Sequence, residues 1–233
     1  MNLNNICIPN ADAPDEALKD YSIKTDHVSV FLKNIKQELI KNIEQADIIF
    51  GCVAWLTDFD ILDKLSEKKF VSIIVQKEDF LRPDFLVNKN TWKADLHNKY
   101  NKINNTHLIE RHQLNNILGL MSVCCDPSIN PIRCVGNHNK DKTPAFPRMH
   151  NKFIIFAKHT ENKSEYYKID PYSVWTGSFN FTKNAGYSLE NALLINDKKI
   201  IEAYFNEYGQ IAALSEELDW TSDWIEPQWR IGS

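Results

Sequence analysis

Five polar residues in the second half of the chain could together cleave a phosphodiester. His150 carries an imidazole able to attack phosphorus, and Lys152 adds a fixed positive charge two residues later. Ser178 and Asn180 supply neutral hydrogen-bond donors for phosphate oxygens, and Glu190 supplies a carboxylate that can hold an imidazole in its attacking tautomer. Each of these short motifs is weak evidence alone, but their order and their places at the edges of apolar segments favour a single site.

The segments that carry these residues have the pattern of strands. Three apolar or β-branched segments are expected as strands: 148–157 (RMHNKFIIFA), 172–176 and 189–195. Because strand side chains alternate, the first of them would place His150 and Lys152 on the same side. A polar turn is expected at 158–164 and another short strand at 165–169, whereas Gly177 to Asn180 has the composition of a tight turn.

The rest of the chain alternates helix and strand patterns. Apolar residues from Val30 to Ala46 recur every three or four positions, which predicts an amphipathic helix. Further expected elements are strands at 47–55, 70–76 and 132–135, a short helix to Leu65 capped by Thr57 or Asp58, and a long helix over 197–218. This order predicts an α/β layered core.

Composition limits the class of protein. The 233 residues have a net charge of −4 and are 43% hydrophobic, which is typical of a globular protein. Five cysteines without C-x-x-C spacing argue against a disulfide framework or a zinc ribbon. With neither a signal-peptide pattern nor an apolar run of about 20 residues, a cytoplasmic location and no stable membrane association are expected.

Several runs resemble the signature of a known family. MHNKFIIF, VWTGSFNFT and SLENALLI are similar to the motifs of the phospholipase D superfamily, above all to its small nucleases with one H-x-K motif per chain. IEQADIIFGCVAWLTDFDILDKL and FVSIIV resemble the N-terminal half of that family, so the resemblance covers about 30–76 and 132–215. It implies an α/β fold with a mixed β-sheet flanked by helices on both faces. The expected divisions are a polar N-terminal arm (1–25), a catalytic domain (26–218) and an acidic tail containing tryptophans (219–233).

The resemblance also assigns roles to the candidate residues. His150 would be the nucleophile that forms a covalent phosphohistidine, and Lys152 would bind the phosphoryl oxygens. Ser178 and Asn180 would complete the anion pocket, and Glu190 would hydrogen-bond to the histidine. Neither a metal nor a cofactor is implied, since lysine and amide donors take over the electrostatic work of a cation.

The chemistry needs a second histidine to protonate the leaving oxygen. The chain has one H-x-K motif, so the resemblance implies a homodimer in which two copies of His150 share one active site. The family often has an aspartate five residues after the lysine, where this chain has Ala157. Asp170 cannot be assumed to replace it.

Local charge favours nucleic acid as the substrate. Residues 131–160 hold six basic residues and one acidic residue, a local net charge of +5. Arg148 and Lys158, two of these basic residues, are expected to contact substrate, and so is Gly177. Two alternatives stay open: a phospholipase or phosphatidyltransferase acting on lipid phosphodiesters, and a non-catalytic dimeric module that binds nucleic acid.

Other polar clusters have simpler interpretations. Asp58, Asp60 and Asp63 are expected on the solvated face and cap of a short helix rather than in a paired-carboxylate site. The segment with His107 and His112 lacks a recognised metal-ligand spacing.

Overall fold

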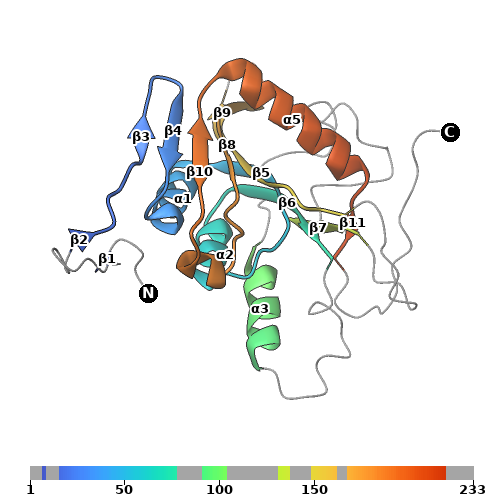
Figure 1. Ribbon diagram of the computed structural model, residues 1–233. Helices are drawn as coiled ribbons and strands as arrows, with labels where there is room; N and C mark the ends of the chain where they lie inside the picture. Colours follow the sequence, from blue (N-terminus) through green and yellow to red (C-terminus); the bar gives the residue numbers. More distant parts are fainter. Residues whose placement is uncertain are drawn as a thin grey trace.

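The computed structural model describes residues 7–8, 16–77, 91–103, 131–136, 148–161 and 167–218 (Figure 1). Its strands are β1 (Cys7–Ile8), β2 (Glu16–Ala17), β3 (Ile23–Lys24), β4 (Val28–Phe31), β5 (Ile48–Val53), β6 (Phe70–Gln76), β7 (Ile132–Val135), β8 (Lys152–Glu161), β9 (Tyr167–Gly177), β10 (Ala192–Ile195) and β11 (Glu216–Glu217). Within these residues, β1 and β2 pair with each other, and the other nine form one sheet in the order β11-β7-β6-β5-β8-β9-β10-β4-β3.

The sheet is mixed, with a parallel part and an antiparallel part. Strands β5, β6 and β7 run parallel, whereas β8, β9, β10 and β4 each pair antiparallel with their neighbours. Every residue of β5 is buried, as expected for a strand covered on both faces. The α/β class predicted from the sequence is confirmed.

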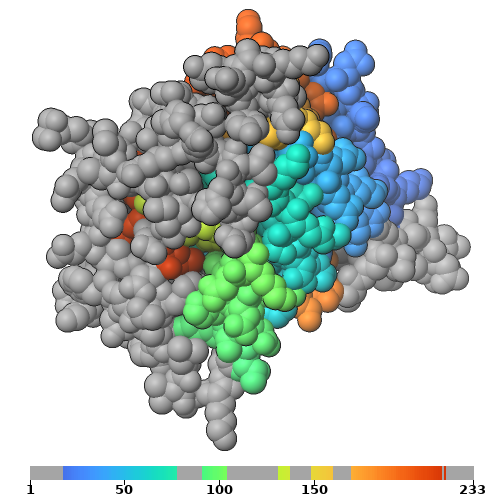
Figure 2. Space-filling model, turned by 180° about the vertical axis from the view of Figure 1, so that it is seen from behind, coloured from blue at the N-terminus to red at the C-terminus, as the bar shows by residue number. Residues whose placement is uncertain are grey.

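Helices cover both faces of the sheet. Helices α1 (Ile35–Gln45), α2 (Phe59–Ser66) and α3 (Thr91–Lys102) contribute buried side chains to one core cluster, and α5 (Lys198–Ala213) contributes to a second on the opposite face. Figure 2 shows green α3 beside the teal part of the chain, in keeping with the packing of α2 against α3. Burial of these apolar faces is the main force that fixes the helices on the sheet.

The start of α2 is held by Asp58, as the sequence predicted. The buried Asp58 carboxylate accepts a hydrogen bond from the backbone N–H of Asp60 at 3.0 Å and lies 2.7 Å from Lys36 Nζ. Lys36 also pairs with Asp60, and Asp63 pairs with Lys99 at 2.6 Å. The three aspartates therefore cap the helix and form ion pairs on its face.

Some predicted boundaries were wrong because partners distant in sequence decide them. The helix expected from Val30 begins only at Ile35, after Asn34 with φ 52°, because residues 28–31 pair in register with β10. The turn expected at 158–164 was wrong in its first half, since β8 continues to Glu161. The strands expected at 165–169 and 172–176 are the single strand β9. The long helix ends at Ala213 because 216–217 pair with β7.

Three further expectations concern membrane-spanning helices, the cysteines, and two segments that lie outside the described residues. None of the described helices has the length and apolar character to cross a membrane. Cys52 and Cys134 are buried free thiols. The tail 219–233 and the segment with His107 and His112 lie outside the described residues.

Candidate active site

The candidate nucleophile lies immediately before β8, at the edge of the sheet where β5 ends. His150 is exposed and belongs to an irregular segment, so the prediction that it lies within a strand was wrong. Two contacts to the main chain hold this segment. The N–H of Met149 donates to Gln76 Oε1 at 2.6 Å, and the N–H of Ala54 donates to the carbonyl of Asn151 at 2.9 Å. The backbone beside His150 is thus fixed while its imidazole faces solvent.

Lys152, the first residue of β8, is held close to His150. Its Nζ donates to the His150 carbonyl oxygen at 2.9 Å. Partial burial lowers the pKa of Lys152 from its ordinary value, and attraction to the Glu190 carboxylate opposes that shift. The lysine is therefore a partly desolvated cation held at the His150 main chain, with the Glu190 carboxylate near enough to act on its charge.

Ser178 and Glu190 form a second pair at the junction of β9 and β10. Ser178 Oγ donates a hydrogen bond to Glu190 Oε2, and Ser178 Oγ accepts one from the N–H of Asn191 at 3.1 Å. The Ser178 N–H also donates to the Asn191 carbonyl at 3.1 Å. In the part of the chain that the structure describes, Glu190 bonds to serine and not to the His150 imidazole as the family resemblance had implied.

Gly177 is required by this close approach of two strands. A Cβ at Gly177 would lie 2.3 Å from the Asn191 carbonyl oxygen and 2.8 Å from the Ala192 Cα. Any larger residue would force β9 away from β10. Gly177 thus has a structural role that places Ser178 opposite Glu190, while its predicted contact with substrate stays a prediction.

Asn180 follows the same turn and has an unmatched polar atom. Its Oδ1 is buried and has no hydrogen-bond partner among the described residues. This oxygen is an acceptor, so it does not bear on the predicted role of the Asn180 amide N–H groups as donors to phosphate, which stays a prediction.

Not every predicted residue reaches this edge. Arg148 is exposed close to His150, but Lys158 lies six residues beyond Lys152 along β8. Lys158 Nζ donates to the Gln45 carbonyl, so the prediction that it contacts substrate is not supported by its position. Arg133 is buried and bonds to Ser215 at 2.7 Å, so the basic residues of 131–160 do not form a single surface.

The family relationship follows from a match over this part of the chain. Residues 127–212 match the family model described as "Cardiolipin synthase, PLD-like domain". The matched segment contains the His150–Lys152 pair and the Ser178–Glu190 pair. The chain belongs to the phospholipase D superfamily.

Individual relatives include a viral protein and bacterial structures. The uncharacterized protein L381 of Acanthamoeba polyphaga mimivirus is 32% identical over 210 residues, which cover 86% of this chain and 70% of that protein. Nuc, a phospholipase D family member from Salmonella typhimurium, is 21% identical, with 78% and 90% of the two chains covered and a TM-score of 0.43. NucT from Helicobacter pylori is 18% identical, with 78% and 94% covered and a TM-score of 0.42.

Sequence reasoning missed Gln76 as a member of this phospholipase D site. Gln76 Oε1 accepts the hydrogen bond from the Met149 N–H, and Gln76 Nε2 donates to the Lys77 carbonyl at 3.1 Å. Gly136, at φ 92°, leaves room for it, because a Cβ there would lie 2.4 Å from Gln76 Nε2. The available signal was a polar residue ending the apolar segment FVSIIVQ.

The described residues of this phospholipase D member include no group of three or more His, Cys, Asp or Glu side chains that could hold a metal ion. The side chains at the candidate site supply an imidazole, an ammonium, a hydroxyl and a carboxylate. This set suits nucleophilic attack on a phosphodiester, with charge stabilisation by the lysine.

Proposed function

We propose that this protein is a metal-independent nuclease that cleaves phosphodiesters through a covalent intermediate on His150. The observation that carries the proposal is the placement of Lys152. Its ammonium lies on the His150 carbonyl and within electrostatic reach of Glu190, which Ser178 in turn holds. A phosphate bound there would contact the cation while the exposed imidazole attacks it.

The reaction takes two steps, each a displacement at phosphorus. A nitrogen of His150 attacks phosphorus, an N–P bond forms, and the bond from phosphorus to the leaving oxygen breaks. A second histidine gives its proton to that oxygen. Water then attacks phosphorus and returns a proton to the second histidine, and the N–P bond breaks to release the phosphate monoester.

The second histidine is proposed to be His150 of another copy of the chain. Among the described histidines, His27 lies beyond the end of β10 that is remote from Ser178, where its carbonyl accepts a hydrogen bond from the Asn196 N–H. His159 lies nine residues from His150 along β8, about 30 Å for an extended strand. His97 lies on α3. An exposed His150 at a sheet edge suits a twofold axis that brings two copies together.

Nucleic acid is the favoured substrate because exposed cations adjoin the site. Arg148 and Lys183 are exposed at the ends of the two segments that carry the site residues.

One observation favours a lipid phosphodiester as the second candidate. Leu189 is 78% exposed and Trp55 is 41% exposed, and such apolar side chains could enter a membrane surface.

A substrate panel in EDTA tests the proposal directly. The purified protein should cleave labelled single- or double-stranded DNA or RNA with EDTA present, because Lys152 replaces the charge of a metal. Products would be separated on denaturing gels. Binding without cleavage would contradict the nuclease and identify a non-catalytic module. If the protein neither binds nor cleaves any of the nucleic acids but hydrolyses phospholipids in vesicles, the result would favour the lipid candidate.

Mixing subunits tests the shared site. If each dimer has one site built from two copies of His150, a hybrid of wild type and His150→Ala lacks either the nucleophile or the acid. After equal mixing and random exchange, activity per total protein should fall to about one quarter of the wild-type value. Independent sites would instead retain about one half, measured as initial rates after refolding the mixture together.

A further inference from the structure

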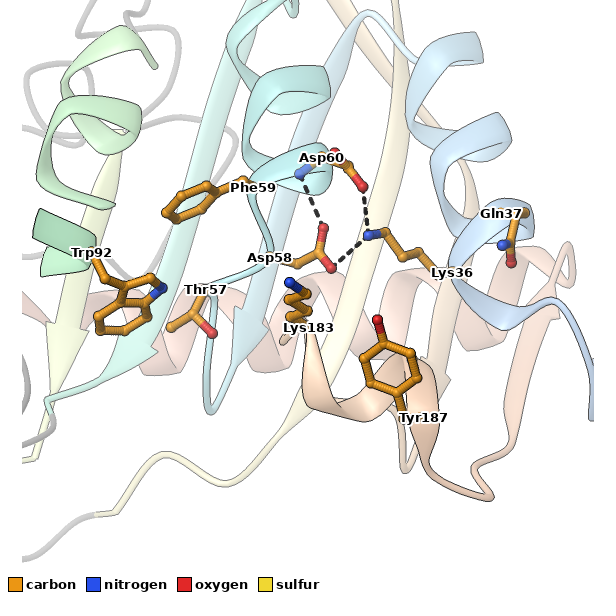
Figure 3. A pocket seen from close by; sticks show the side chains of 10 residues that line it. Lys36, Gln37, Thr57, Asp58, Phe59, Asp60, Trp92, Lys183 and Tyr187 are labelled. Carbon is orange, nitrogen blue, oxygen red and sulfur yellow. Dashed lines mark hydrogen bonds and ion pairs between the residues drawn. The ribbon is translucent and has the colours of Figure 1, made fainter. Parts of the chain in front are cut away.

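A pocket beside the catalytic edge lies among α1, α2, α3 and η4 (Asn184–Tyr187). Its volume is about 620 Å³, within the range of pockets that hold small organic groups. Trp92 and Tyr187 stand on opposite sides of it, and Lys36 with its two aspartate partners lies above them in the view of Figure 3. Nothing in the reaction proposed above uses these residues.

The walls of this pocket suit a planar ring. Trp92 is 39% exposed and Tyr187 is 49% exposed, so both rings present apolar area to solvent. Phe59 adds a third aromatic side chain to the lining. Exposed aromatic faces of this kind are the surfaces on which bases of single-stranded nucleic acids stack.

The polar groups suit an uncharged ligand better than a phosphate. Lys36 Nζ lies 2.7 Å from a carboxylate oxygen of Asp58 and 2.7 Å from one of Asp60, so its charge is balanced. Lys183 remains as a cation, but the Asp60 side chain is 72% exposed in the same pocket. Thr57 adds a hydroxyl group. Donors and acceptors without excess positive charge match the edge of a heterocyclic base.

Backbone hydrogen bonds tie the pocket to the catalytic edge. The Thr57 N–H donates to the Phe181 carbonyl at 2.8 Å, and the Phe181 N–H donates to the Trp55 carbonyl at 3.1 Å. Thr57 lies three residues from Ala54, whose N–H holds the segment of the nucleophile. Three residues span at most about 10 Å, so the pocket is within a few nucleotides of the attacked phosphorus.

We propose that this pocket binds a nucleobase of the substrate strand, with Trp92 and Tyr187 as stacking surfaces. The inference rests on the proposed nuclease function and makes it more specific. A base must leave its pair and its stack to enter, so the substrate is a single-stranded or locally opened nucleic acid. Trp55, 41% exposed, lies in the sequence between Ala54 at the catalytic edge and Thr57 at the pocket, so the strand would pass close to it.

Binding by fluorescence anisotropy tests the pocket separately from catalysis. The full chain carrying His150→Ala would be titrated with a labelled single-stranded oligothymidine and with an abasic strand of the same length. Loss of one stacked base should raise Kd roughly 5- to 150-fold. Adding Tyr187→Ala or Trp92→Ala should bring the ratio of the two Kd values towards one, whereas Tyr187→Phe and Trp92→Phe should preserve it.

A matched control is Tyr21→Ala, because Tyr21 is 73% exposed and does not line the pocket. Its ratio of Kd values should equal that of the parent. Equal affinity for both strands in the parent, no binding of either strand, or an unchanged ratio in both alanine variants would overturn the inference. If the ratio holds but the wild type cleaves nothing in EDTA, only the nuclease proposal fails. Cleavage without any dependence on bases would remove only the pocket.

Discussion

Replacing His150 by alanine should lower kcat by at least about a thousandfold while the protein stays folded. The imidazole is proposed to form the N–P bond, and its copy in the second subunit to protonate the leaving oxygen, so one substitution removes both groups. Because His150 is exposed, the substitution should change the free energy of unfolding by less than about 0.5 kcal/mol. Initial rates on a labelled oligonucleotide and thermal unfolding would measure the two effects.

The covalent intermediate gives this prediction a second readout. Alkaline quenching during turnover should leave a labelled nucleotide fragment on the wild-type protein, because its N–P bond to histidine survives alkali, and none on His150→Ala. His27→Ala is the control, since His27 is exposed at the other end of the sheet. Full activity in His150→Ala would rule out this nucleophile.

Replacing Lys152 by alanine should lower kcat/KM about 100- to 1000-fold. Loss of one preorganised donor to a developing negative charge has an effect of this size, and Lys152 is partly buried, where charge interactions are stronger than in water. Lys158→Ala is a matched control in the same strand. A comparable loss in Lys158→Ala would support its sequence-predicted contact with substrate and contradict the assignment from position.

The pH profile of substrate binding by His150→Ala, which lacks the proton-donating histidine, should carry the signature of Lys152. The charged form is the one that binds phosphate, so affinity is present below its folded pKa and lost as pH rises through it. Burial lowers that pKa, so the alkaline limb should lie below the ordinary lysine value of about 10.4. Glu190 opposes the shift, and Glu190→Gln should therefore move the limb to still lower pH. A limb that moves upward in this variant would contradict the assignment.

Local patterns predicted the central elements of the fold. Strand β6 and strand β7 were expected at their observed residues, because each is a short apolar run bounded by polar or turn residues. The Asp58 cap was expected for the same local reason. The assignment of Val30 and Phe31 to a helix was wrong because pairing with β10, more than 160 residues away, outweighs their helical spacing.

The candidate site was predictable in its residue types and less so in its contacts. The motif identified the His150–Lys152 and Ser178–Glu190 pieces, and the structure places them at one edge of the sheet. The roles assigned to them stay predictions. The contact of Gln76 with the Met149 N–H could not be predicted, because it joins residues 73 positions apart through a side chain and a backbone group. Neither could the pocket, whose walls come from separate segments.

Main-chain hydrogen bonds link residues 55–58 to Phe181. The Phe181 carbonyl receives the N–H groups of both Thr57 and Asp58, and its own N–H is bound by the Trp55 carbonyl. Such bonds do not depend on which side chains the residues carry. Exposed positions such as Trp55 and Tyr187 can therefore be exchanged without moving one segment against the other. Protein engineering or natural selection could change which ligands this surface accepts while the geometry of the candidate active site is kept.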